Sequence, residues 1–308
     1  MRKSLKIVVA CLFLVGVLFL HFYAPRFITE IKNPFIETAK GSFLITTTPK
    51  FENNQLPGKY ITFESFDKVE LSCYLTYSSR DIAKGTIILL HGIRSNKECF
   101  IGLVNKLSLL GYNSVALDSR AHGGSKGVHC TFGVKEKQDI SELINVLEKR
   151  EGITGNVGVW GQSLGGAIAL QAMGIDKRIQ FGIIESTFSE FRTITNDYFK
   201  YHVGFNIPPL TNYLVYRAGL IANFDPAEAC PSKYCININQ PILIVHGNQD
   251  NRIAIKYAKE NFENISGKKK NFIEVEGANH LNVWKVGGDD YFEKAINFLN
   301  ENTANYNN

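Results

Sequence analysis

Three residue types that can cooperate in nucleophilic catalysis stand far apart in this sequence of 308 residues, each shortly after an apolar run. They are Ser163 in Gly161-Gln162-Ser163-Leu164-Gly165, Asp250 in His246-Gly247-Asn248-Gln249-Asp250, and His280 at the end of Glu276–His280. A serine hydroxyl is a weak nucleophile at neutral pH, so it needs a base to take its proton and an acid to hold that base in the right tautomer. The three positions therefore indicate acyl transfer through a serine.

The glycines around Ser163 indicate a sharp turn between a strand and a helix. Residues 156–160 have the pattern of a short buried strand, and residues 166–173 are small or helix-forming. Gly161 and Gly165 suit a strained turn at which the strand and helix backbones leave no room for a β-carbon. The motif thus stands in the context that an exposed nucleophilic serine needs.

Short apolar runs along the chain predict the fold. Runs of Ile, Val and Leu are typical of parallel strands buried on both faces, with crossover helices between them. Six such runs are Thr86–Leu90, Ser114–Leu117, Val157–Trp160, Phe181–Ile184, Pro241–Val245 and Phe272–Val275. Ahead of them, Tyr60–Phe66 and Val69–Tyr77 alternate as a hairpin turning at Asp67 and Lys68. We expect an α/β fold with a mostly parallel eight-stranded sheet, helices on both faces, and functional residues at the carboxyl ends of the strands.

One connection is longer than the others, at about residues 187–239. It is rich in Phe and Tyr and is interrupted at Ile207-Pro208-Pro209-Leu210. We expect two short helices that lie over the carboxyl edge of the sheet as a lid. The alternative is an ordinary crossover helix with a decorated loop.

The amino terminus has the composition of a membrane-targeting segment. Ile7–Leu20 is almost wholly apolar, and a helix of about 18 residues spans roughly 27 Å, close to a bilayer core of roughly 30 Å. Arg2, Lys3 and Lys6 precede it, which favours a cytoplasmic amino end with the bulk of the chain on the non-cytoplasmic side. Because Pro25 follows and no small-x-small site precedes it, we expect an uncleaved signal anchor rather than a secreted protein.

The chain divides on this basis into three parts. Residues 1–24 are the expected signal anchor, residues 25–58 are a proline-rich linker that tethers or wraps the domain, and residues 59–308 are the catalytic domain with the lid inserted.

Composition narrows the function classes. The chain has 34 Lys and Arg against 29 Asp and Glu, and 44% of its residues are hydrophobic. Without a zinc-finger spacing, a Walker loop or basic-aromatic alternation, we expect no nucleic-acid partner. The five cysteines outside the anchor cannot all pair within one chain. A Cys99–Cys130 or Cys230–Cys235 disulfide and fully reduced thiols all remain open.

From Tyr60 to Leu299 the sequence resembles the α/β-hydrolase superfamily, near its lysophospholipase and serine aminopeptidase-like members. The resemblance rests on the serine motif together with Leu89–Gly92, Asp118–Ser125 and His246–Asp250, in the order typical of the family. It implies Ser163 as nucleophile, His280 as base and Asp250 as orienting acid. It also implies an oxyanion hole from the backbone N–H groups of Ile93 and Leu164, with no metal or cofactor.

Alternatives remain for individual roles. Glu185 closes the strand after the serine unit and competes with Asp250 for the acid, whereas His91, His122 and His246 are expected to be structural. Ile93–Asn96 is bulkier than in many relatives, which suggests a narrower acyl pocket.

The expected function is hydrolysis of a carboxylic ester, either a small molecule or a lipid-like ester, through an acyl-enzyme at a membrane. A serine aminopeptidase-like peptidase is the first alternative, and it would need a carboxylate in the lid to hold a free amine. The candidates are Glu190, Asp197, Asp225 and Glu228. A non-catalytic binding module on the same fold is the second.

Overall fold

A single mixed sheet of eight strands organises the protein, as the computed structural model shows for residues 2–32, 50–51 and 56–303. The strand order is β1-β2-β4-β3-β5-β6-β7-β8. The strands are β1 Gly58–Glu64, β2 Glu70–Thr76, β3 Thr86–Leu90, β4 Asn113–Leu117, β5 Val157–Gln162, β6 Ile179–Glu185, β7 Ile242–Gly247 and β8 Lys270–Val275. β1 pairs antiparallel with β2, and β2 pairs antiparallel with β4, while the six strands β3 to β8 are parallel to one another. The predicted fold class and all six predicted parallel strands are confirmed.

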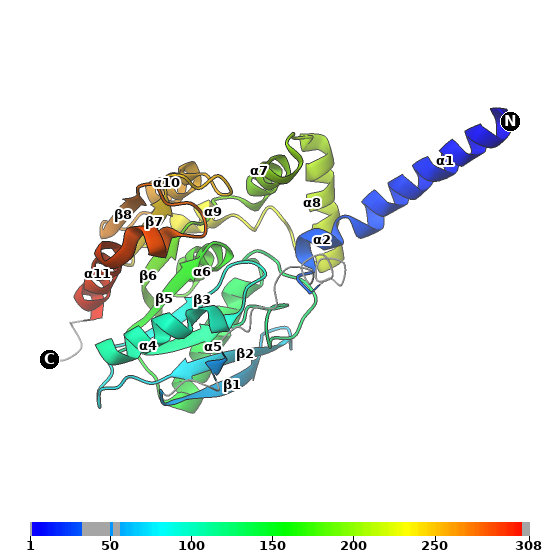
Figure 1. Ribbon diagram of the computed structural model, residues 1–308. Coiled ribbons are helices and arrows are strands. Elements are labelled where there is room, and N and C mark those ends of the chain that lie inside the picture. The colour runs from blue at the N-terminus through cyan, green and yellow to red at the C-terminus, as the bar shows by residue number, and fades with distance from the viewer. Residues whose placement is uncertain (1, 33–49, 52–55, 304–308) are drawn as a thin grey trace.

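Helices cover both faces of this sheet (Figure 1). On one face α5 (Glu136–Glu151), α6 (Leu164–Ile175) and α10 (Ile255–Asn264) bury their apolar sides against the strands. On the other face α4 (Ile101–Leu110) and α11 (Val283–Thr303) form a second core. Successive residues of β3 alternate between the two cores, as the two-residue period of a strand requires.

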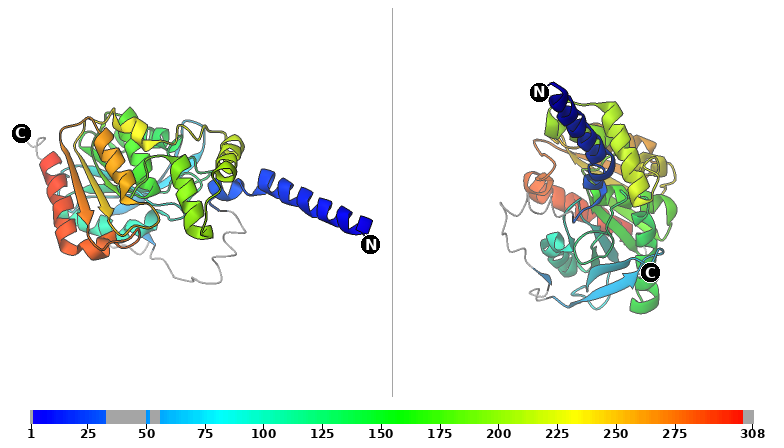
Figure 2. Two further views of the ribbon diagram at one scale, coloured as in Figure 1. Left: turned by 90° about the horizontal axis from the view of Figure 1, so that it is seen from above. Right: turned by 90° about the vertical axis from the view of Figure 1, so that its right-hand side faces the viewer.

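The long connection contains three helices. α7 (Phe191–Val203) ends at Gly204, whose φ of 88° suits a residue without a β-carbon, and α8 (Pro208–Ala222) begins at the predicted proline break. These are the two helices that the sequence predicts for this connection, and they lie apart from the sheet (Figures 1 and 2). The third helix, α9 (Pro231–Cys235), packs against α6 and α10 and so belongs to the body of the domain.

The amino-terminal helix projects from the domain into open space (Figure 2). It comprises α1 (Arg2–Leu18), a π-helical turn η1 (Phe19–Tyr23) and α2 (Arg26–Thr29). The stretch Lys3–Thr29 is long and apolar enough to cross a membrane, with a mean hydropathy of 2.6 over its best window. None of that window is buried within the protein.

The end of this helix and the residues that follow it dock on the domain. The Cys130 N–H donates to the Thr29 carbonyl at 2.9 Å, and the Lys32 ammonium donates to the carbonyls of Gly123 and Ser125 at 2.8 and 3.1 Å. The expected linker therefore begins as an ordered part of the domain. Its residues 33–49 and 52–55 lie outside the described residues.

Candidate active site

The turn from β5 into α6 presents Ser163 at a strained backbone position. Its φ of 55° and ψ of −117° are unusual for a side chain larger than glycine. A β-carbon on Gly165 would lie 1.9 Å from the Leu90 carbonyl oxygen, and one on Gly161 would lie 2.3 Å from the Gly165 carbonyl oxygen. The flanking glycines are thus required by close backbone contact, as the sequence predicts.

The structure brings Ser163, His280 and Asp250 together. His280 Nε2 lies 3.0 Å from Ser163 Oγ, and His280 Nδ1 lies 2.7 Å from Asp250 Oδ2. The other carboxylate oxygen, Asp250 Oδ1, accepts the backbone N–H groups of Arg252 and Ile253, each at 2.9 Å. A carboxylate on Nδ1 keeps the proton there and leaves Nε2 free to accept the hydroxyl proton, which is the arrangement needed to activate a serine.

A second imidazole, which sequence reasoning treated only as structural, touches the same carboxylate. His246 Nε2 lies 2.7 Å from the Ile253 carbonyl oxygen and 3.4 Å from Asp250 Oδ2. Burial raises the pKa of Asp250, but the hydrogen bonds from His246 and His280 outweigh it and lower the pKa below the usual range. Asp250 is therefore ionised at neutral pH. The four-residue spacing from His246 to Asp250 was the available signal for this contact.

The loop after β3 lies beside the serine. A β-carbon on Gly92 would lie 3.4 Å from Ser163 Cβ and 3.9 Å from Ser163 Oγ, so the backbone of this loop passes close to the serine. Among the described residues, the N–H groups of Ile93 and Leu164 donate to no acceptor in the protein. An oxyanion hole formed by these two N–H groups stays a prediction.

Buried side chains hold this loop in place. His91 accepts the Ser119 N–H on Nε2 at 3.2 Å, and its Nδ1 donates to the Gly92 carbonyl at 2.8 Å. Lys97 pairs with Asp118 at 2.5 Å, and both side chains are almost fully buried. Burial lowers the pKa of His91, and burial together with the neighbouring His91 lowers the pKa of His122 to about 3. These two histidines are neutral supports of loop backbone, in agreement with the sequence-based expectation.

Glu185, the competing acid, lies elsewhere. Its carboxylate accepts the indole N–H groups of Trp160 at 2.6 Å and Trp284 at 2.9 Å, as well as the Tyr291 hydroxyl. Burial raises its pKa against the lowering effect of these three donors. Among the described residues it makes no contact with His280, so the geometry excludes this alternative.

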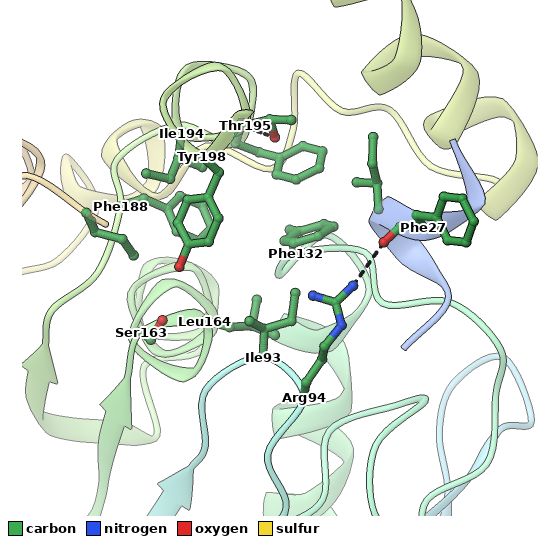
Figure 3. Close-up of a pocket in the computed structure, with 13 residues that line it drawn as sticks. Phe27, Ile93, Arg94, Phe132, Ser163, Leu164, Phe188, Ile194, Thr195 and Tyr198 are labelled. Atoms are coloured by element: carbon green, nitrogen blue, oxygen red, sulfur yellow. Dashed lines mark hydrogen bonds between the residues drawn. The ribbon is translucent and has the colours of Figure 1, made fainter. Parts of the chain in front are cut away.

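An apolar cavity of about 170 Å³ opens onto Ser163 (Figure 3). Its walls come from the loop after β3, from α6 and α7, and from the amino-terminal segment. The lining residues are Phe27, Ile28, Ile93, Arg94, Phe132, Ser163, Leu164, Phe188, Phe191, Ile194, Thr195, Tyr198 and Ile253. Sequence reasoning missed the contribution of Phe27 and Ile28, because nothing in the expected linker distinguishes a docked residue from a tether. The bulky Ile93–Arg94 pair does line the cavity, as its position after the glycine suggests.

The cysteines contribute no crosslink to this site, since all six are free thiols. Cys99 is exposed, whereas Cys130 is buried and its burial raises its pKa. Of the alternatives left open by the sequence, the structure contains the reduced one.

Comparison with known proteins shows what this chain is similar to. The family model described as serine aminopeptidase, S33, matches residues 81–190, which include the loop after β3 and the serine turn. The uncharacterized protein YqkD of Bacillus subtilis is 24% identical over 238 residues, covering 72% of this chain and 77% of that protein. Protein ABHD12B of Homo sapiens is 24% identical over 271 residues, covering 85% and 72% respectively.

Solved structures share the fold. The esterase Pf2001 of Pyrococcus furiosus superposes with a TM-score of 0.69 at 21% identity, covering 84% of this chain and 96% of that one. An esterase of Exiguobacterium antarcticum gives a TM-score of 0.56 at 17% identity, and the match covers 77% of this chain and 98% of that one. The chain therefore has the α/β-hydrolase fold. Residues 81–190 are similar to the serine aminopeptidase S33 family.

Proposed function

We propose that the protein is a serine hydrolase that cleaves a carboxylic ester through an acyl-enzyme on Ser163. The observation that carries this proposal is the unbroken chain of contacts from Ser163 Oγ through His280 to Asp250. The hydrolase fold, the S33 match and the esterases among the structural relatives support it.

The reaction follows from these contacts. Ser163 Oγ attacks the ester carbonyl carbon while its proton passes to His280 Nε2, and the N–H groups of Ile93 and Leu164 stabilise the resulting oxyanion. The C–O bond to the alcohol then breaks, and His280 returns the proton to the departing oxygen. Water, deprotonated by the same imidazole, attacks the acyl-serine and releases the acid and the free hydroxyl.

The cavity favours an ester over an aminopeptidase substrate. A free amine calls for a carboxylate near the serine, but no carboxylate lines the described part of the cavity. The four lid candidates have other partners: Glu190 binds Thr193, Asp197 binds Tyr257, Asp225 caps the Ala227 N–H and Glu228 binds Tyr234. The wall is otherwise aromatic and aliphatic, which suits an acyl chain.

We further propose that Lys3–Thr29 anchors the enzyme in a membrane, with the domain on the non-cytoplasmic side. At 1.5 Å per residue its 27 residues span about 40 Å, enough to cross a bilayer core of roughly 30 Å. The lid lies at the base of this helix, where His21 Nδ1 is 2.6 Å from the Tyr213 hydroxyl. The exposed apolar side chains of the lid are Tyr201, Val203, Phe205, Ile207, Tyr213, Tyr216 and Leu220. An apolar lid beside a membrane anchor supports a lipid-like ester as substrate.

A substrate panel tests the proposed reaction. The full chain should hydrolyse p-nitrophenyl esters of varied acyl length and leave aminoacyl p-nitroanilides intact, while Ser163→Ala is inactive on both. Faster cleavage of the anilides would instead favour the peptidase. If wild type and Ser163→Ala are equally inert on the whole panel, the fold serves as a binding module.

A further inference from the structure

Arg94 is a partly buried cation that lines the cavity. It follows Ile93 directly and adopts a φ of 59°. One terminal nitrogen, Nη2, donates to the Phe27 carbonyl at 2.9 Å. Its Nε–H is buried and has no acceptor among the described residues.

Two buried cations of this domain, Arg120 and Lys97, are neutralised by carboxylates, whereas Arg94 is not. Arg120 pairs with Asp139 at 2.6 Å and with Asp67 at 3.0 Å, and Lys97 pairs with Asp118. Among the described residues, no carboxylate oxygen lies within 4 Å of the Arg94 guanidinium. Taking a guanidinium out of water without a counter-charge is costly, so buried charges in proteins are normally paired.

The groups that act electrostatically on Arg94 do not supply the missing charge. They are the Cys130 thiol and the Tyr198 hydroxyl, and burial raises the pKa of each above its usual value. Both are therefore neutral at pH 7. Burial also lowers the pKa of Arg94 itself, yet a guanidinium remains charged at any physiological pH.

The guanidinium faces the space in which a substrate would lie. Figure 3 shows it below the Phe132 ring, with Ile93 and Ser163 toward one side and Phe27 toward the other. Its remaining N–H groups form a planar fork, which matches the two oxygens of a carboxylate or a phosphate.

We propose that Arg94 binds an anionic group of the substrate, a carboxylate or a phosphate, so that the preferred ester is an anionic amphiphile. The apolar part lies among the aromatic side chains of the cavity, and the anionic group takes the position of the missing counter-ion. This inference rests on the proposed function, because it places the anion in the same cavity as Ser163.

The competing explanation is that Arg94 only fastens the amino-terminal segment through the Phe27 carbonyl. Lys32 offers a matched control, because it fastens the same segment through the carbonyls of Gly123 and Ser125 without lining the cavity. Arg94→Met and Lys32→Met both remove a cation that holds this segment. Only the first removes a cation from the cavity.

Binding to the full chain in nanodiscs of neutral lipid tests the proposal, with Ser163→Ala as the background and empty nanodiscs subtracted. The probes are hexanoate, hexyl phosphate and hexanol, titrated by calorimetry. We expect at least one of the two anions to bind more tightly than hexanol. Arg94→Met should weaken the binding of that anion at least tenfold, while the affinity for hexanol changes less than twofold. Lys32→Met should leave the affinities for all three probes unchanged. Preference for hexanoate identifies a carboxylate as the partner, and preference for hexyl phosphate identifies a phosphate.

Two outcomes would overturn the proposal. In one, neither anion binds tighter than hexanol. In the other, Arg94→Met and Lys32→Met weaken all three probes alike, which would make Arg94 a fastening residue. Hydrolysis of p-nitrophenyl butyrate by the wild type is measured separately. Its absence would refute the proposed ester hydrolysis without altering the reading of the anion titrations.

Discussion

Replacing Asp250 with asparagine should abolish most of the activity while leaving the fold intact. The carboxylate oxygen that faces His280 Nδ1 at 2.7 Å would become an amide, and the N–H donor of that amide cannot accept the imidazole proton. The imidazole would then carry its proton on Nε2, where it can no longer take the proton of Ser163. Loss of the correct tautomer lowers kcat by roughly 10⁴-fold, or about 5.4 kcal/mol. The asparagine oxygen can still accept the N–H groups of Arg252 and Ile253.

Glu185→Gln is the matched comparison, since it makes the same chemical change in the competing carboxylate. Trp160, Trp284 and Tyr291 all donate to Glu185, so a glutamine would turn its own N–H₂ toward one of these donors. An unsatisfied buried donor costs about 1–3 kcal/mol of unfolding free energy. We expect a lower midpoint of urea unfolding and a kcat within about tenfold of wild type.

The assay is kcat on a p-nitrophenyl ester, with urea unfolding of each variant measured in parallel. A folded Glu185→Gln protein without activity, beside an Asp250→Asn protein that keeps more than a tenth of the wild-type kcat, would refute the assignment of the acid.

Three further predictions concern the supports of the site. Gly165→Ala should abolish folding or activity, because its β-carbon would lie 1.9 Å from a backbone carbonyl oxygen. Gly102→Ala, whose β-carbon would lie in open space, should not lower the stability. Equal urea midpoints for the two variants would contradict this prediction. Lys97→Met should lower the unfolding free energy by about 3–5 kcal/mol, since it leaves the buried Asp118 carboxylate without its cation, and a loss below about 1 kcal/mol would refute that pairing. Because the pKa of Asp250 is lower in the folded protein than in the unfolded chain, its ionised form stabilises the fold above about pH 4, and this stabilisation is lost as the pH falls through the native pKa. The difference in unfolding free energy between wild type and Asp250→Asn should therefore be constant from pH 7 to about 4 and become smaller below pH 4. A difference that grows on acidification would contradict the lowered pKa.

Much of the fold was predictable from local sequence. Apolar runs such as Thr86–Leu90 can be read directly, because a parallel strand is buried on both faces and needs no partner to reveal its pattern. The sharp turn at Ser163 was equally predictable, because glycines on both sides of a serine, at 161 and 165, indicate close backbone contact. Chain order and strand ends then placed Ser163, Asp250 and His280 on one edge of the sheet.

Contacts between distant segments were not predictable. The docking of Phe27 and Ile28 into the cavity wall depends on the shape of the domain, and two apolar residues in a four-residue helix carry no periodicity of their own. The partners of Glu185 are likewise invisible in the sequence, because Trp160, Trp284 and Tyr291 meet only across the folded core. Arg94 was noticed for its bulk, but its lack of a counter-charge emerges only when the positions of all neighbouring carboxylates are known.

Mass spectrometry of the protein after treatment with a fluorophosphonate tests the central claim most directly. Wild type should gain one phosphonyl group, on the peptide that contains Ser163, while Ser163→Ala should gain none and His280→Ala should react far more slowly. Labelling of wild type at another residue, or no labelling of a folded protein whose cavity binds short esters, would contradict the account.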